Sequence, residues 1–107
     1  MRPRELRFYE TRTGTAPCRD WLDDLEKSRD RAHGMVLNRL DRVEVGNFGD
    51  CKHLGNGIWE LRIALGPGYR VYFGEDGDRV VLLQGGSKKT QTQDIKIAKK
   101  YWSEYIA

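Results

Sequence analysis

Cysteine and histidine are scarce in this chain of 107 residues, which contains two of each. Cys18 and Cys51 do not form a C-x-x-C pair and are too few for a disulfide framework, so we expect reduced, structural thiols. His53 lies two positions after Cys51 and His33 stands alone in a predicted helix, which leaves too few ligands for a metal site. The sequence therefore predicts neither a metal nor another cofactor.

Long apolar runs are also absent. No stretch approaches the roughly 18 apolar residues that a membrane-spanning helix needs, and the opening MRPRELRFYE has no hydrophobic segment of a signal peptide. We therefore expect a cytoplasmic protein with no membrane partner. No repeat, linker or low-complexity tract interrupts the chain, and we expect residues 1–107 to form a single domain.

The net charge is only +3, but the basic residues are unevenly placed. Residues 1–51 hold equal numbers of basic and acidic residues, whereas in residues 79–100 Asp94 is the single acid. The basic residues of that segment are Arg79, Lys88, Lys89, Lys96, Lys99 and Lys100. A cationic C-terminal portion favours a polyanionic partner, because basic side chains neutralise phosphates and release counterions. A merely soluble, lysine-rich helix is the alternative that charge alone leaves open.

The spacing of apolar residues is helical over about residues 17–45, and after residue 51 its period changes to two. The expected helices span about residues 17–28, 29–45 and 90–106, with Thr90 and Gln93 as a capping box for the last. The expected strands are residues 5–11, 58–65, 69–73 and 79–84. The segment 79–84 is apolar on both faces, which places it inside the sheet. The sequence thus predicts an α+β fold of order β-α-α-β-β-β plus a C-terminal helix, with a mainly antiparallel sheet against a helical hairpin.

The segment GIWELRIALGPGYRVYF, residues 57–73, predicts a β-hairpin with two distinct faces. If Leu65 opposes Tyr69 across Gly66-Pro67-Gly68, Arg62 pairs with Tyr72 and Ala64 with Arg70. One face is apolar and consists of Trp59, Leu61, Ile63, Leu65, Tyr69, Val71 and Phe73. The other face holds Glu60, Arg62, Ala64, Arg70 and Tyr72. A slip of one residue would bury charges, so the apolar face fixes which side each residue takes.

Two arginines on adjacent strands offer forked donors that match a phosphate. Glu60 on the same face could accept a proton beside a bound phosphodiester. Gly85-Gly86 is interpreted as a bend that brings Lys88 and Lys89 toward Arg70. The alternative is a surface salt-bridge network, which would contribute little to stability.

The residues that support this interpretation also resemble those of a known family. They are Trp59-Glu60-Leu61-Arg62, Gly68-Tyr69-Arg70, Leu82-Leu83-x-Gly85-Gly86-x-Lys88, and Gln91 with Asp94-Ile95. Together they resemble type II toxins of the RelE/ParE superfamily, and more closely the phage-derived, HigB-like "addiction module killer protein" branch. The resemblance covers nearly the whole chain and includes the β-α-α-β-β-β order.

The resemblance implies an endoribonuclease that cleaves mRNA in the ribosomal A site without a metal, by attack of the 2′-hydroxyl on the neighbouring phosphate. It implies inhibition of translation, with mRNA and the ribosome as partners. It also implies a cognate antitoxin, bound in a toxin–antitoxin hetero-oligomer.

By position, Arg70 matches the family's phosphate-binding arginine, Arg62 a basic residue on the preceding strand, and Lys88 or Lys89 a cation after the last strand. The chain departs from the family where Glu60 stands in place of a lysine of some members, and where residues 90–93, directly after Lys89, contain no His or Tyr. We therefore predict the catalytic group Glu60, Arg62, Arg70 and Lys88, with Glu60 as base, and the RNA-binding group Tyr72, Lys89 and Lys96. Tyr72 would stack on a base or act as acid.

The incomplete acid–base set leaves two alternatives. One is a ParE-like inhibitor of DNA gyrase without nuclease activity. The other is a non-catalytic homologue that only binds its antitoxin.

Overall fold

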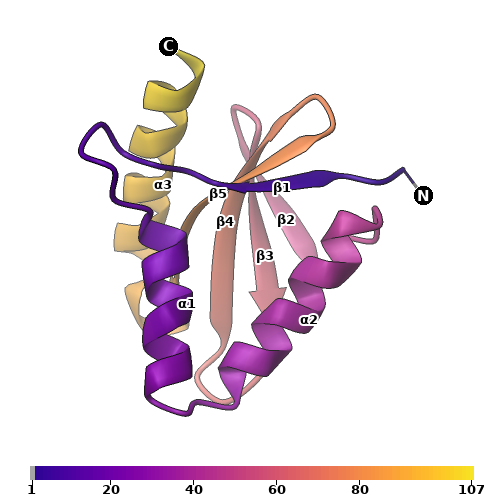
Figure 1. Cartoon of the computed structure of the whole chain (residues 1–107), viewed down its shortest axis with the longest axis vertical. Coiled ribbons are helices and arrows are strands. Elements are labelled where there is room, and N and C mark those ends of the chain that lie inside the picture. Colours follow the sequence, from indigo (N-terminus) through magenta and orange to yellow (C-terminus); the bar gives the residue numbers. More distant parts are fainter. Residues whose placement is uncertain (1) are drawn as a thin grey trace.

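A computed structural model describes residues 2–107, in which five strands form a sheet of spatial order β1-β5-β4-β3-β2 (Figure 1). The strands are β1 (Glu5–Phe8), β2 (Cys51–Gly55), β3 (Ile58–Ile63), β4 (Tyr69–Asp76) and β5 (Arg79–Ser87). β1 and β5 are parallel, and the other neighbouring pairs are antiparallel. The predicted α+β class and mainly antiparallel sheet are confirmed, as is the internal position of β5.

The three α-helices are α1 (Pro17–Lys27), α2 (Ala32–Glu44) and α3 (Gln91–Ile106), and a 3-10 turn, η1 (Lys88–Thr90), precedes α3. In Figure 1, α1 and α2 cover one face of the sheet and α3 lies behind it. Pro17 begins α1 because the first helical position needs no backbone donor. Arg29, in a left-handed conformation, separates the first two helices, and Asp30 Oδ1 accepts a hydrogen bond from the Ala32 amide (2.9 Å) at the start of α2. No helix of the described residues is long and apolar enough to cross a membrane.

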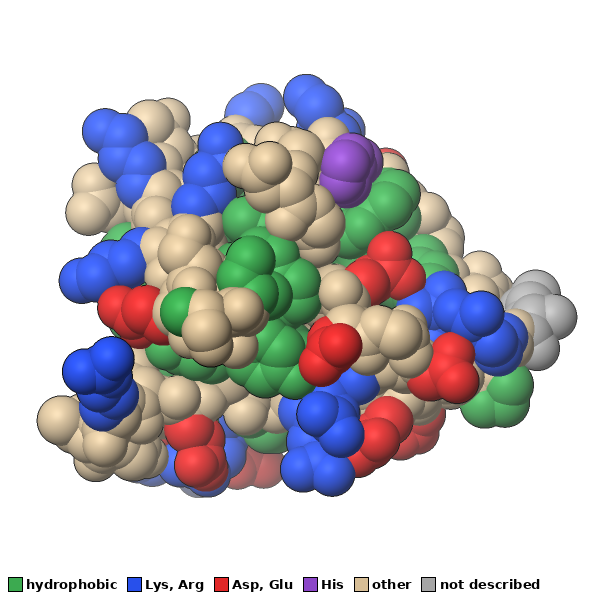
Figure 2. Space-filling model, turned by 90° about the horizontal axis from the view of Figure 1, so that it is seen from above, with side chains coloured by type: hydrophobic (Ala, Val, Ile, Leu, Met, Phe, Trp, Pro, Cys, Tyr) green, Lys and Arg blue, Asp and Glu red, His purple; other side chains and the backbone are tan. Residues whose placement is uncertain are grey.

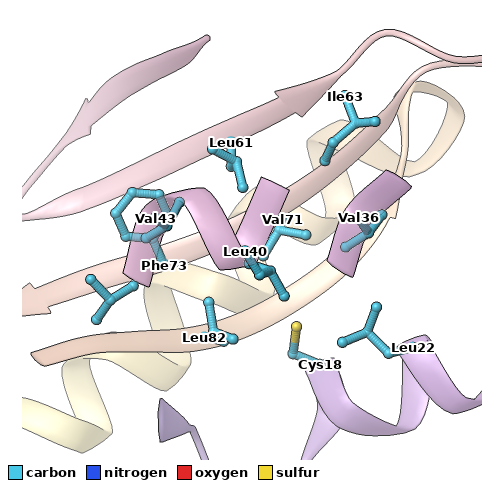
Figure 3. Close-up of a cluster of buried hydrophobic side chains, with 11 residues drawn as sticks. Cys18, Leu22, Val36, Leu40, Val43, Leu61, Ile63, Val71, Phe73 and Leu82 are labelled. Carbon is cyan, nitrogen blue, oxygen red and sulfur yellow. The ribbon is translucent and has the colours of Figure 1, made fainter. Parts of the chain in front are cut away.

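The main core lies between the helical hairpin and the sheet, as Figure 3 shows. Its buried members are Cys18, Leu22, Val36, Leu40, Val43, Leu61, Ile63, Val71, Phe73, Val80 and Leu82. The predicted apolar face of the hairpin supplies four of these residues, so its assignment to the core is confirmed. Cys18 is a free, fully buried thiol, and burial raises its pKa to about 12.

A second buried cluster lies beneath α3 on the opposite face of the sheet. Its members are Tyr9, Ile58, Tyr72, Val81, Leu83, Ala98 and Trp102. Trp102 packs so closely on Gly74 that a β-carbon at this glycine would overlap the indole ring. Helices therefore cover both faces of the sheet. The first turn of α3 covers part of the hairpin face that carries Glu60, Arg62 and Arg70.

The C-terminal end of α3 and the β3–β4 loop lie at opposite ends of the molecule (Figure 1). Viewed from that end in Figure 2, apolar side chains gather at the centre, and basic and acidic side chains both lie around them. Ile106 is among the exposed large apolar residues of the chain. The charged residues of the hairpin, Glu60, Arg62 and Arg70, lie toward the other end, near the β3–β4 loop and the start of α3.

Strand β2 is absent from the sequence prediction. Lys52 and His53 are exposed and no apolar alternation marks the segment, because β2 is an edge strand. Its backbone pairs with β3, with His53 opposite Trp59, and this pairing leaves no trace in side-chain periodicity. The observed order is therefore β-α-α-β-β-β-β, followed by the C-terminal helix.

The predicted register of the hairpin is wrong by two residues. Arg62 lies opposite Arg70, and Glu60 lies opposite Tyr72. The loop is longer than three residues because the Gly68 amide bonds to the Leu65 carbonyl (2.9 Å), and Gly66 and Gly68 both have positive φ. A shift of two residues leaves each side chain on its predicted face, since strand periodicity is two.

Gly85 and Gly86 are also placed differently from the prediction. They continue β5 opposite Val71 and Arg70 and do not form a bend. A β-carbon at Gly85 would overlap the Trp21 ring, and one at Gly86 would overlap the Asp94 carboxylate. The two glycines are therefore needed for close packing on both faces of the strand.

Candidate functional site

Two rows of side chains cross β3, β4 and β5 on the face beneath the start of α3. The polar row consists of Glu60, Tyr72 and Gln84, which are successive cross-strand partners. The arginine row consists of Arg62, Arg70 and Gly86, which are also cross-strand partners. This row lies two residues closer to the β3–β4 loop than the polar row. The corrected register thus brings the two predicted arginines directly opposite each other.

The Glu60 carboxylate is fully buried and has partners on both oxygens. Oε1 accepts a hydrogen bond from Arg62 Nε (2.9 Å) and lies 3.8 Å from Arg70 Nε. Oε2 accepts a hydrogen bond from Gln91 Nε2 (2.7 Å) at the start of α3. One carboxylate therefore connects both arginines to the helix that covers them.

Burial by itself raises the pKa of Glu60, but hydrogen bonds from Arg62 and Gln91 and the charges of Arg62 and Arg70 outweigh it. The pKa consequently lies below its ordinary value, and Glu60 is an ion at neutral pH. A carboxylate with a lowered pKa and two occupied oxygens is a weak proton acceptor. Its geometry suits the holding of cations better than the removal of a proton.

The two arginines differ in exposure. The Arg62 side chain is 35% exposed and that of Arg70 is 13% exposed. Arg70 Nη1 donates to the Tyr69 carbonyl (3.1 Å), whereas its Nε has no hydrogen-bond partner. Since a guanidinium has five donor hydrogens, each arginine keeps donors that an anion arriving from solvent can reach.

Lys88 joins this group from the end of β5. Its amide donates to the Gly68 carbonyl (2.8 Å), which ties η1 to the β3–β4 loop. A β-carbon on Gly68 would lie 3.2 Å from Arg70 Nη1 and 3.8 Å from Lys88 Cβ, so these residues are neighbours. Lys88 and Lys89 are exposed and form no ion pair with any described residue. Lys96 is exposed on α3, outside the two rows.

Tyr72 is fully buried, and its hydroxyl has no hydrogen-bond partner among residues 2–107. Burial, followed by the negative charges of Glu60 and Asp94, raises the pKa of this phenol. The ring therefore has no exposed surface on which an RNA base could stack, and the hydroxyl retains its proton at neutral pH. The stacking contact and the acid role expected for Tyr72 have no support in this geometry.

A second set of hydrogen bonds, which the sequence analysis missed, fixes the start of α3. Gln84 Nε2 donates to Asp94 Oδ1 (3.1 Å), and the Thr90 hydroxyl donates to Asp94 Oδ2. Thr90 therefore does not cap α3 with Gln93 as predicted, because its hydroxyl donates to Asp94 and accepts from the Ser87 amide (3.4 Å). The signal in the sequence is Gly86, whose missing side chain leaves the space that Asp94 fills.

The histidines lie elsewhere: His53 on β2 packs against the Trp59 ring (4.7 Å between centroids), and His33 lies in the first turn of α2. Within residues 2–107, no group of three or more His, Cys, Asp or Glu side chains is arranged to hold a metal ion. The two rows themselves place the cations Arg62 and Arg70 around the buried carboxylate of Glu60.

Comparison with known proteins shows the family. The model of the family "Phage derived protein Gp49-like (DUF891)" matches residues 20–103. The chain belongs to this family. Gp49-like proteins are of the RelE and addiction-module-killer type, which confirms the predicted resemblance at family level and points to the toxin of a toxin–antitoxin pair. The matched range contains both rows and most of α3.

A relative of this Gp49-like chain is an "Uncharacterized protein" of Haemophilus influenzae (strain ATCC 51907 / DSM 11121 / KW20 / Rd). It is 49% identical over 80 residues, which cover 74% of this chain and 79% of the relative.

Proposed function

We propose that residues 1–107 form the toxin domain of a type II toxin–antitoxin module, of the HigB-like branch, which cleaves mRNA on the ribosome in the cytoplasm and so inhibits translation. The observation that carries the proposal is the opposed pair Arg62 and Arg70, held by one buried carboxylate and flanked by Lys88. Family membership supports the same conclusion.

In the proposed reaction the 2′-hydroxyl of one nucleotide attacks the adjacent phosphate, and the 5′-oxygen of the next nucleotide leaves. Negative charge increases on the phosphate oxygens in the transition state, and Arg62, Arg70 and Lys88 stabilise it. We assign Glu60 to the positioning of the arginines, because both of its oxygens are occupied. Proton transfer then falls to water or to groups of the ribosome.

Lys89 and Lys96 would contact RNA outside the reacting phosphate. Both are exposed and without ion pairs among the described residues, so binding a phosphate does not require them to give up a protein partner. A cognate antitoxin would neutralise the toxin by covering the basic surface or by packing on α3.

A ParE-like inhibitor of gyrase is the second candidate, and a specific observation favours it. The arginine row contains cations, but neither Glu60 nor Tyr72 beside it is suited to exchange a proton at neutral pH. A protein that only binds a nucleic-acid complex needs the cations and no proton carrier.

Expression of the chain followed by mapping of mRNA 5′ ends separates these functions. The nuclease predicts in-frame cuts that disappear in Arg70→Ala and remain in Arg7→Ala. Arg7 is the matched control because its exposed side chain pairs with Glu5 on β1. Intact mRNA together with SOS induction and gyrase–DNA cleavage complexes would contradict the nuclease, and intact mRNA with antitoxin binding alone would indicate a non-catalytic homologue.

A further inference from the structure

We infer that Gln91 is a positioning residue for the arginine row. Its hydrogen bond to Glu60 fixes the carboxylate, and the carboxylate in turn orients the side chains of Arg62 and Arg70. This inference rests on the proposed function only for its activity readout. The geometric claim concerns the chain by itself.

The orientation of the Gln91 amide is dictated by chemistry. An ionised carboxylate only accepts hydrogen bonds, so the NH2 group of Gln91 must face Glu60 Oε2, at 2.7 Å. With Oε2 held from the helix, the other oxygen is directed toward Arg62 Nε and Arg70 Nε, at 2.9 and 3.8 Å. Gln91 thus determines which way the carboxylate turns.

Gln91 is itself held in place. It is the first residue of α3, directly after η1, whose Lys88 amide is bonded to Gly68. One turn further, Asp94 is anchored to Gln84 and Thr90 above Gly86. The Gln91–Glu60 hydrogen bond therefore connects η1, which contains Lys88, to the arginine pair. It fixes the positions of Lys88, Arg62 and Arg70 relative to one another.

Gln91→Glu tests the inference because it keeps the size of the side chain but replaces the amide with a carboxyl group. This group can donate a hydrogen bond to Glu60 only while it is protonated. Two carboxylates in contact cannot both be ionised at low cost, so the new acid binds a proton well above its ordinary pKa. At pH 6 the protonated acid can donate to Glu60 as the amide does. As pH rises, that proton is lost and the two carboxylates repel each other.

The ionisable groups around Gln91 and Glu60 are Lys52 on β2, Arg62 on β3, Arg70 and Tyr72 on β4, and Lys88 and Asp94 beside the start of α3. Burial keeps Tyr72 protonated between pH 6 and 8. The lowered pKa of Glu60 keeps its carboxylate ionised over the same range. A change of activity between pH 6 and 8 in the variant is therefore traceable to position 91.

The cleavage rate of Gln91→Glu relative to the wild type is expected to fall at least tenfold from pH 6 to pH 8. Gln91→Met, which has no donor, should be at least tenfold slower than the wild type at both pH values. Gln93→Glu is the matched control, since Gln93 is exposed on the same turn and makes no side-chain hydrogen bond. Its relative rate should not change with pH. Unfolding midpoints of all variants verify that each one is folded.

A second readout is independent of RNA cleavage. The ¹⁵N–¹H signal of Arg62 Nε reports its bond to Glu60. The signal should shift with pH in Gln91→Glu and stay constant in the wild type and in Gln93→Glu. A wild-type chain that cuts no RNA but shows this pattern would contradict the proposed function and support the positioning role. An unchanged Arg62 signal and full activity in Gln91→Met, or pH-independent behaviour of Gln91→Glu, would overturn the inference.

Discussion

Replacement of Glu60 by glutamine tests whether the buried carboxylate holds the arginine row. The exchange keeps the shape of the side chain but removes its charge and one of its two acceptor oxygens. The remaining carbonyl can accept from Arg62, and the Gln91 amide can then turn so that its oxygen accepts from the new NH2 group, so the main loss is the negative charge beside Arg62 and Arg70. A hydrogen bond to a buried charged group contributes about 1.5–3 kcal/mol, and Arg62 can recover part of this from water, so we expect a loss of about 1–2 kcal/mol.

The measurement is equilibrium unfolding in urea, followed by tryptophan fluorescence. Glu60→Gln should lower the midpoint without changing the slope, whereas Glu5→Gln, in an exposed pair with Arg7, should change the free energy of unfolding by less than about 1 kcal/mol. The pKa of Glu60 is lowered in the fold, so its stabilisation is present above its ordinary pKa of 4.5 and is lost as pH falls through the lower folded value. The difference between wild type and variant should thus shrink below pH 4.5. Equal stability at pH 7, or a difference that is the same at pH 3 and pH 7, would refute the reasoning.

Three further substitutions or reactions have defined outcomes. Gly85→Ala would force a β-carbon into the Trp21 ring and should destabilise the fold by about 1–3 kcal/mol, measured by urea unfolding; an unchanged midpoint would mean that Trp21 can move aside freely. Cys18, whose pKa is raised to about 12 by burial, should not react with a disulfide reagent at pH 8 until the chain unfolds, whereas the partly exposed Cys51 should react in the native state. Replacement of Lys88 and Lys89 by alanine should leave the unfolding midpoint unchanged but weaken the salt dependence of binding to a single-stranded RNA. The slope of log K against log salt concentration should fall by about 1.4 in magnitude, because each lost phosphate contact removes about 0.7. An unchanged slope would show that neither lysine contacts the RNA.

The fold could be predicted largely from apolar spacing, because burial of one face imposes a period on a helix or a strand. The three helices and the core face of the hairpin follow from that period, and β5 was placed correctly because it is apolar on both sides. Strand β2 could not be found in this way, since Lys52 and His53 lie at a solvated edge and only the backbone pairs.

For the candidate site, the shared face of the charged residues could be predicted from the sequence, but their geometry could not. Alternation placed Glu60, Arg62 and Arg70 on one face, but it cannot separate registers that differ by two, and it cannot show that a helix covers that face. For this reason the sequence predicts a free base at Glu60 and an accessible ring at Tyr72, whereas both side chains are buried. The part played by Gln91 depends on a contact across 31 positions of the chain, which no local pattern reveals.

The central claim is tested most directly with purified chain, purified ribosomes and one defined mRNA. The proposed mechanism predicts cleavage in the ribosomal A site, with a 2′,3′-cyclic phosphate on the upstream fragment and a 5′-hydroxyl on the downstream one, and loss of both products with Arg70→Ala. An mRNA that stays intact on ribosomes that have bound the wild-type chain would contradict it.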